Sequence, residues 1–83
     1  MKTFEDLEFK INRFGSFQAI ENFDNGYGIF VVHGRFSHYG DNTYEIAVLK
    51  DGNLCFDTPI TDYILGHQSI DQINDVMKRV QEL

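Results

Sequence analysis

The chain has 83 residues, a formal charge of −6, 42% hydrophobic residues and 14% aromatic residues. A chain of this length builds one thin core, which excludes a multidomain enzyme and leaves little room for a deep internal cavity. Its seven Lys and Arg against thirteen Asp and Glu argue against broad binding to a nucleic-acid backbone. Because the aromatic content excludes a disordered tail, we expect residues 1–83 to form a single domain.

The N-terminal segment carries two local patterns. Thr3 precedes acidic residues, which is typical of the start of a short helix. From Leu7 to Asn12, hydrophobic and polar residues alternate, as they do in a half-buried strand. We therefore expect an extra strand or a short helix at this end of the chain.

An antiparallel meander of about four strands is predicted to follow. The Asn25–Gly26 pair predicts a tight hairpin turn in left-handed conformations, and Asp51 with Gly52 predicts a second turn. One segment is hydrophobic on both faces, with Ile29 and Val31 on one face and Phe30 and Val32 on the other, which is typical of a central strand. The predicted strands cover residues 17–23, 27–36 (the central one), 43–49 and 54–56.

The chain ends in a predicted α-helix. Pro59 cannot donate a hydrogen bond to a neighbouring strand, so the sheet is expected to end there. Ser69 and Gln72 have the spacing of a capping box. One hydrophobic stripe follows at helical spacing, made of Ile70, Ile73, Val76, Met77, Val80 and Leu83. The predicted fold class is α+β, an antiparallel meander packed by one C-terminal helix.

One helix with one hydrophobic stripe cannot cover both faces of a sheet. The second face is then solvated, covered by the N-terminal segment, or buried against another subunit. Tyr27 and Tyr44 carry hydroxyl groups that suit a partly wet interface. A homodimer or higher oligomer therefore stays an open alternative.

Catalytic and metal-binding patterns are weak. Cys55 is the only cysteine, it has no basic neighbour in the sequence, and it cannot form an internal disulfide. The three histidines, His33, His38 and His67, lack the spacing of a metal site. We expect no enzyme activity, no cofactor and no metal.

The charge is unevenly distributed. Between Asp51 and Asp75 the chain has five carboxylates and no Lys or Arg, which suggests a negative surface that meets a basic partner. The start of the chain lacks the pattern of a signal peptide, and no stretch is hydrophobic enough to span a membrane. We expect a cytoplasmic protein that does not bind membranes. The candidate partner-binding residues are Asp57, Asp62, Tyr63, Asp71 and Asp75, with Tyr27 and Tyr44.

Several segments resemble a group of small uncharacterised proteins encoded by bacteriophages and prophages. The matching residues are Asn25 to Gly28, Val31 and Val32, Glu45 to Leu49, Asp57 to Asp62, Gly66, and Val80 to Leu83. The sequence departs from that group at Tyr63, where a second acidic residue is expected, and at Ile11 and Asn12, where a Pro-His pair is frequent. The resemblance implies a phage setting in the cytosol of a bacterial host, and it indicates no particular activity or mechanism.

Two hypotheses about function follow. The first is a non-enzymatic phage accessory protein that binds and inhibits a host protein, such as a CRISPR-type component of anti-phage defence. The second is an oligomeric small-molecule binder that sequesters a nucleotide immune signal, because the aromatic residues could stack on bases.

Overall fold

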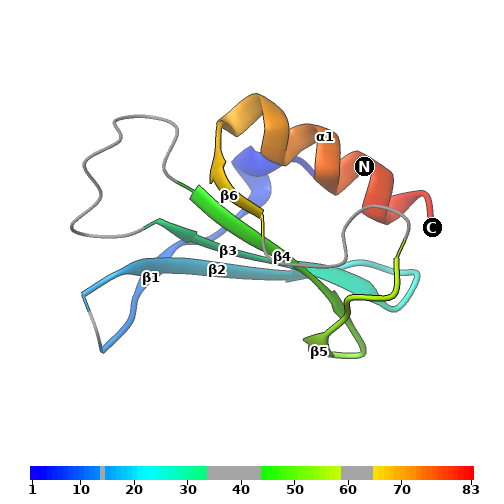
Figure 1. Ribbon diagram of the computed structural model, residues 1–83, viewed down its shortest axis with the longest axis horizontal. Helices are drawn as coiled ribbons and strands as arrows, with labels where there is room; N and C mark the ends of the chain where they lie inside the picture. The colour runs from blue at the N-terminus through cyan, green and yellow to red at the C-terminus, as the bar shows by residue number, and fades with distance from the viewer. Residues whose placement is uncertain (14, 34–43, 59–64) are drawn as a thin grey trace.

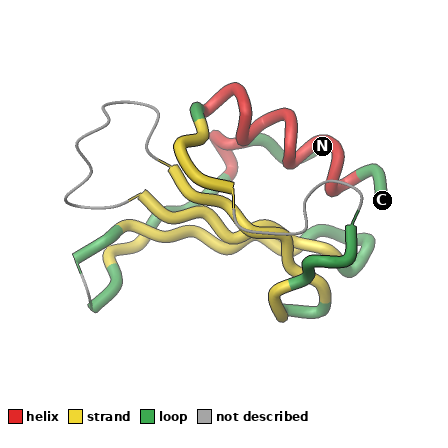
Figure 2. Tube along the Cα trace, viewed as in Figure 1, coloured by secondary structure: helices red, strands yellow, loops and turns green. Residues whose placement is uncertain are grey.

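A computed structural model of the chain describes residues 1–13, 15–33, 44–58 and 65–83. A sheet forms one layer and a single long helix forms the other (Figures 1 and 2). The elements in chain order are the 3₁₀ helix η1 (Phe4–Asp6), β1 (Lys10–Ile11), β2 (Phe17–Asn22), β3 (Tyr27–His33), β4 (Tyr44–Lys50), β5 (Asn53–Leu54), β6 (Leu65–Gln68) and α1 (Ile70–Gln81). The predicted α+β class, an antiparallel meander packed by one C-terminal helix, is confirmed.

The strands are antiparallel in the order β1-β2-β3-β4-β5, and β6 also pairs with β4. Strand β3 lies at the centre, as predicted. The expectation that the sheet ends at Pro59 is wrong, because β6 follows it in the chain and pairs with β4. The residues of β6, Leu-Gly-His-Gln, have no hydrophobic alternation. Its strand conformation therefore depends on the edge of β4 and not on local propensity.

The two predicted turns form, but one has a different geometry. Asp51 and Gly52 have φ angles of 52° and 85° and make the expected two-residue hairpin. Between β2 and β3 only Gly26 is left-handed, with φ 86°, so the left-handed prediction for Asn25 is wrong. A three-residue loop forms instead, and Phe23 N–H donates to Tyr27 O over 2.7 Å. The side-chain amide of Asn25 bonds the end of α1, where its Nδ2 donates to Val80 O over 2.9 Å.

Helix α1 begins at the predicted capping box. Ser69 Oγ accepts from Gln72 N–H over 3.2 Å, and Gln72 Oε1 accepts from Ser69 N–H over 2.8 Å. The buried residues of the helix are Ile73, Val76, Met77 and Val80. The prediction is wrong for the two ends of the hydrophobic stripe, because Ile70 is 42% exposed and Leu83 is 40% exposed.

The core lies between α1 and one face of the sheet. Its fully buried members are Ile29, Val31, Ile46, Val48, Ile73, Met77 and Val80. Each such side chain contributes about 1.5–3 kcal/mol of burial free energy. Helix η1 lies on the same side, where the Phe4 ring centroid is 5.4 Å from that of Tyr44. The N-terminal segment therefore does not cover the second face of the sheet.

Candidate functional site

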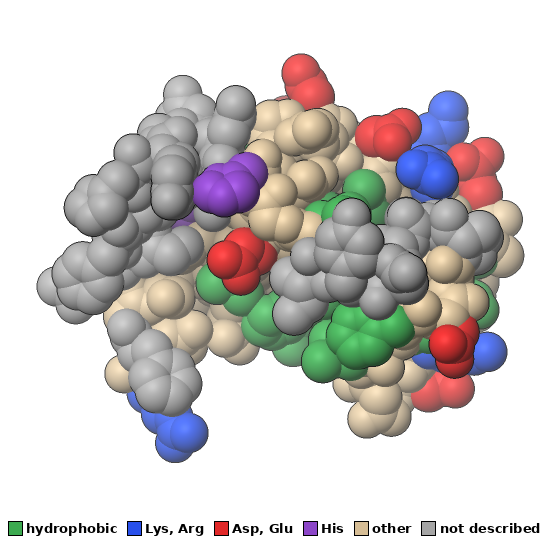
Figure 3. Space-filling view, in the orientation of Figure 1, with side chains coloured by type: hydrophobic (Ala, Val, Ile, Leu, Met, Phe, Trp, Pro, Cys, Tyr) green, Lys and Arg blue, Asp and Glu red, His purple; other side chains and the backbone are tan. Residues whose placement is uncertain are grey.

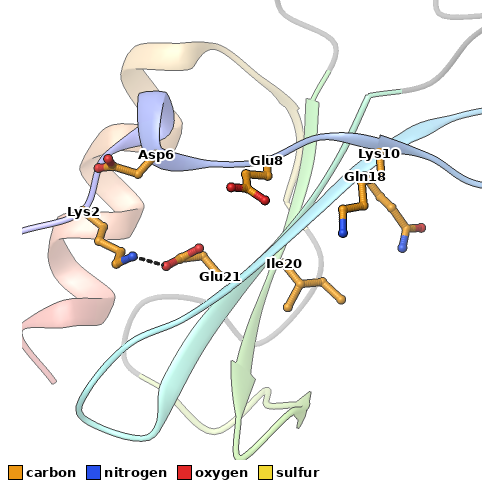
Figure 4. A pocket seen from close by; sticks show the side chains of 7 residues that line it. All are labelled: Lys2, Asp6, Glu8, Lys10, Gln18, Ile20 and Glu21. Carbon is orange, nitrogen blue, oxygen red and sulfur yellow. Dashed lines mark ion pairs between the residues drawn. The ribbon is translucent and has the colours of Figure 1, made fainter.

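A cleft of about 390 Å³ separates the N-terminal segment from the outer edge of β2, and we call it the N-terminal cleft (Figure 4). Its walls carry both signs of charge. The N-terminal segment contributes Lys2, Asp6, Glu8 and Lys10, and β2 contributes Gln18, Ile20 and Glu21. In Figure 4 the N-terminal segment crosses above β2, and the side chain of Glu8 points from this segment toward β2.

The cleft exists because β1 separates from β2 early. The two strands pair only at Lys10 with Gln18 and at Ile11 with Phe17. Continuing this register would place Glu8 opposite Ile20, but the chain before Lys10 turns toward α1, where Leu7 joins the core. The strand predicted from Leu7 to Asn12 is therefore wrong except at 10–11.

The outer edge of β2 faces the cleft. Phe23, directly after β2, donates its N–H to Tyr27 O of β3. Backbone groups alternate in direction along a strand, so Glu21 and Ala19 also direct their N–H and C=O toward β3. Ile20 lies between these two residues and directs its N–H and C=O away from β3. The pairing of β1 with β2 ends at Gln18, so β1 does not reach Ile20. An edge of this kind can accept a further strand.

One end of the cleft is closed by contacts to Lys2. Its Nζ lies 2.6 Å from Glu21 Oε1, and this hydrogen bond and the charge of Glu21 raise the pKa of Lys2 above its usual value. The backbone of Lys2 is held to α1, since its N–H donates to Gln81 Oε1 and its C=O accepts from Gln81 Nε2, each over 2.8 Å. The N-terminal segment is thus fixed to both β2 and α1.

The other end is closed around Asn12. Its N–H donates to Ser16 O over 2.8 Å, and its Oδ1 accepts from Ser16 N–H over 3.0 Å. Its Nδ2 donates to Gln18 Oε1 over 3.1 Å. With both ends fixed, the walls need little reordering when a ligand enters, which lowers the entropic cost of binding.

The charges inside the cleft are not equally available. Glu21 is paired with Lys2, and Asp6 Oδ2 accepts from Thr3 N–H over 2.8 Å. The side chains of Glu8 and Lys10 have no ion pair or hydrogen bond within the described part of the chain. With three carboxylates and two ammonium groups, the cleft favours a cationic group beside Glu8.

The second face of the sheet forms another surface, which we call the open sheet face. Its residues are Ile20, Phe30, Val32, Ala47, Leu49 and Leu54, of which Ala47 and Leu49 are buried, with Glu45 at the edge. Hydrophobic side chains reach the surface in the lower half of Figure 3, on the side of the sheet away from α1. The structure confirms the sequence prediction that Phe30 and Val32 share a face opposite Ile29 and Val31.

The acidic residues predicted to bind a partner come from different elements in the described parts of the chain. Asp71 and Asp75 are exposed on α1, and Asp75 Oδ2 lies 4.0 Å from Arg79 Nη1. Asp57 is exposed after β5. Asp62 and Tyr63 lie outside the described residues.

The two tyrosines predicted for the same role lie on the α1 side of the sheet, Tyr27 at the start of β3 and Tyr44 at the start of β4, where it pairs with His33. Tyr27 is half-buried, with Lys50 Nζ 5.3 Å from its ring centroid. Tyr44 packs against the core, and its ring centroid is 4.7 Å from that of His33. Neither side chain lines the N-terminal cleft or belongs to the open sheet face.

Other candidate chemistry lies apart from the cleft. Cys55 is half-buried, His67 is exposed, and His38 lies outside the described residues. In the described ranges no group of three or more His, Cys, Asp and Glu could hold a metal ion. Across those ranges no helix has the length and hydrophobicity needed to cross a membrane. Comparisons with protein-family models, with curated proteins and with solved structures find no match to this chain.

Proposed function

We propose that this chain is a non-enzymatic accessory protein that binds and inhibits a host protein in the bacterial cytosol. The resemblance to phage-encoded proteins favours a component of anti-phage defence as the target. We further propose that the N-terminal cleft binds an extended, positively charged segment of that target.

The open edge of β2 carries this proposal. Ile20 directs its backbone N–H and C=O into the cleft, and the carboxylate of Glu8, which has no ion pair among the described residues, lines the same cleft. An extended peptide adds to such an edge through main-chain hydrogen bonds, while nearby side chains select its sequence. The net charge of −6 would speed association with a basic partner.

A peptide titration tests the binding mode. Its probe is a short peptide that alternates lysine with valine, and an acidic peptide of the same length serves as the comparison. We expect the lysine peptide to shift the backbone amide resonances of Ile20 and Glu8 and the acidic peptide to leave them unchanged. No shift at Ile20, or equal shifts with both peptides, would contradict strand addition at this edge.

Capture of the host target tests the biological role. Glu8→Lys should reduce the amount of target retained from infected cells at least severalfold, because it replaces the carboxylate by a cation. Glu5→Lys makes the same charge change on an exposed residue of η1 that does not line the cleft. Equal loss in both variants would contradict the cleft as the binding site. Binding of a nucleotide with no retained protein would favour the small-molecule hypothesis instead.

A further inference from the structure

The open sheet face is unusually hydrophobic for the outer face of an antiparallel sheet. Such a face is commonly polar when it meets water. Here Ile20 and Leu54 are 52% and 55% exposed, Phe30 and Val32 are half-buried, and Ala47 and Leu49 are buried. Large hydrophobic side chains that are exposed on one such face are typical of a contact with another molecule.

Two opposite charges flank this face at the same level of the sheet. The register pairs Lys10 with Gln18, Gln18 with Val32, and Val32 with Glu45, so all four side chains lie in one row on one face. Lys10 and Glu45 are the two ends of the row and both are exposed. Three strand spacings of about 4.8 Å separate their backbones by about 14 Å.

We infer that a second copy of this chain covers the open sheet face, related to the first by a two-fold axis that runs parallel to the strands between β2 and β3. This rotation reverses the order of the strands across the interface. It keeps the position along the strand direction, so each row of side chains faces the same row of the other copy. Lys10 of each copy then faces Glu45 of the other, and Ile20 of each copy faces Phe30 of the other. The interface is therefore self-complementary in both charge and hydrophobicity, as a two-fold interface must be.

The charge balance favours a second copy as the occupant. Each chain carries a charge of −6, so contact between two arbitrary surfaces of this protein is repulsive. The flanking row of the open sheet face carries one cation and one anion and forms two attractive pairs in the dimer. Sheets packed face to face in this way lie about 30° apart, an angle that the long side chains of Lys10 and Glu45 can span.

The dimer and the N-terminal cleft share three residues, because Lys10, Gln18 and Ile20 line the cleft and also lie on the open sheet face. The backbone edge of Ile20 and the carboxylate of Glu8 stay outside the proposed interface. The inference does not rest on the proposed function, since it concerns self-association in the absence of any host protein.

Charge exchange tests the interface. In sedimentation equilibrium at low salt, Lys10→Glu or Glu45→Lys should each raise the dimer dissociation constant about tenfold, since each places two like-charge pairs across the axis. The double variant, Lys10→Glu with Glu45→Lys, should restore the original constant. Lys78→Glu on the exposed side of α1 changes the net charge as Lys10→Glu does and should leave the constant unchanged.

Three results of the sedimentation measurements on the wild type and the charge variants would overturn the inference. They are a wild-type chain that stays monomeric at the highest concentration measured, a double variant as weak as either single variant, and a Lys78→Glu variant as weak as Lys10→Glu. Replacing the hydrophobic contact by Ile20→Asp should abolish the dimer, and an unchanged circular dichroism spectrum would show that the variant is folded. A folded Ile20→Asp dimer of wild-type affinity would contradict the proposed packing.

Discussion

Replacing Gly28 by alanine tests how closely β2 and β3 approach each other. A Cβ atom at this buried position would lie 2.6 Å from the Glu21 carbonyl oxygen and 3.3 Å from Asn22 Cα, which are both backbone atoms. Since backbone cannot rotate away as a side chain can, β2 must shift. Overpacking of this kind costs about 1–3 kcal/mol, a large part of the roughly 5–10 kcal/mol expected for a small domain.

Urea unfolding followed by circular dichroism measures this loss. With a slope of about 1 kcal/mol per molar urea, the midpoint for Gly28→Ala should fall by about 1–3 M at an unchanged slope. Gly66→Ala is the matched control, because Gly66 also lies in a strand but has no atom within 4 Å of the place that an added Cβ would take. The control should be neutral or more stable by about 0.4–1 kcal/mol, because alanine restricts the unfolded chain. A Gly28→Ala variant as stable as Gly66→Ala would refute the steric argument.

Three further changes test the packing and the links between elements. Met77→Ala removes a fully buried side chain and should cost about 2–5 kcal/mol in a thermal unfolding measurement. Ser69→Ala removes the helix cap and should cost about 1 kcal/mol, whereas Ser69→Asp, which can still cap, should cost less. The contact of Lys2 with Glu21 raises the pKa of Lys2, so its stabilising effect is fully present below the usual value of 10.5 and is lost as the pH rises through the raised pKa. The amide resonances of the N-terminal segment should therefore change on the alkaline side in the wild type, and Lys2→Met should abolish that change.

Local chemistry explains why the helix and two turns could be predicted from the sequence. Ser69 and Gln72 satisfy each other's backbone groups within one turn, so their spacing alone defines the start of α1. Asp51 and Gly52 can adopt the left-handed conformations of a two-residue hairpin without help from the rest of the fold. The alternation in β3 likewise separated Ile29 and Val31 from Phe30 and Val32.

The features that the sequence did not predict depend on contacts between distant residues. Strand β6 has little strand propensity of its own, and it forms only where Leu65 and Gln68 meet the edge of β4. Asn25 has the local preference for a left-handed turn, but its amide bonds Val80 at the other end of the chain. Such contacts leave no pattern in a short window of sequence.

The N-terminal cleft could not be predicted for a related reason. The alternation from Leu7 to Asn12 correctly identified an extended segment, but it could not show where that segment leaves the sheet. The burial of Leu7 under α1 decides this, and the bonds of Lys2 to Glu21 and Gln81 fix the result. Lys2, Asp6, Glu8 and Lys10 lie close together in the sequence, but no local pattern shows that they face Glu21 across a cleft.

The reciprocal bonds between Lys2 and Gln81 also bear on how the protein is made. A ribosome delivers Lys2 first and Gln81 seventy-nine residues later. Until then the closed end of the cleft lacks its anchor, and the buried face of the sheet lacks α1. We therefore expect a nascent chain halted before α1 to remain sensitive to protease, and protection to appear only after the helix has emerged from the exit tunnel.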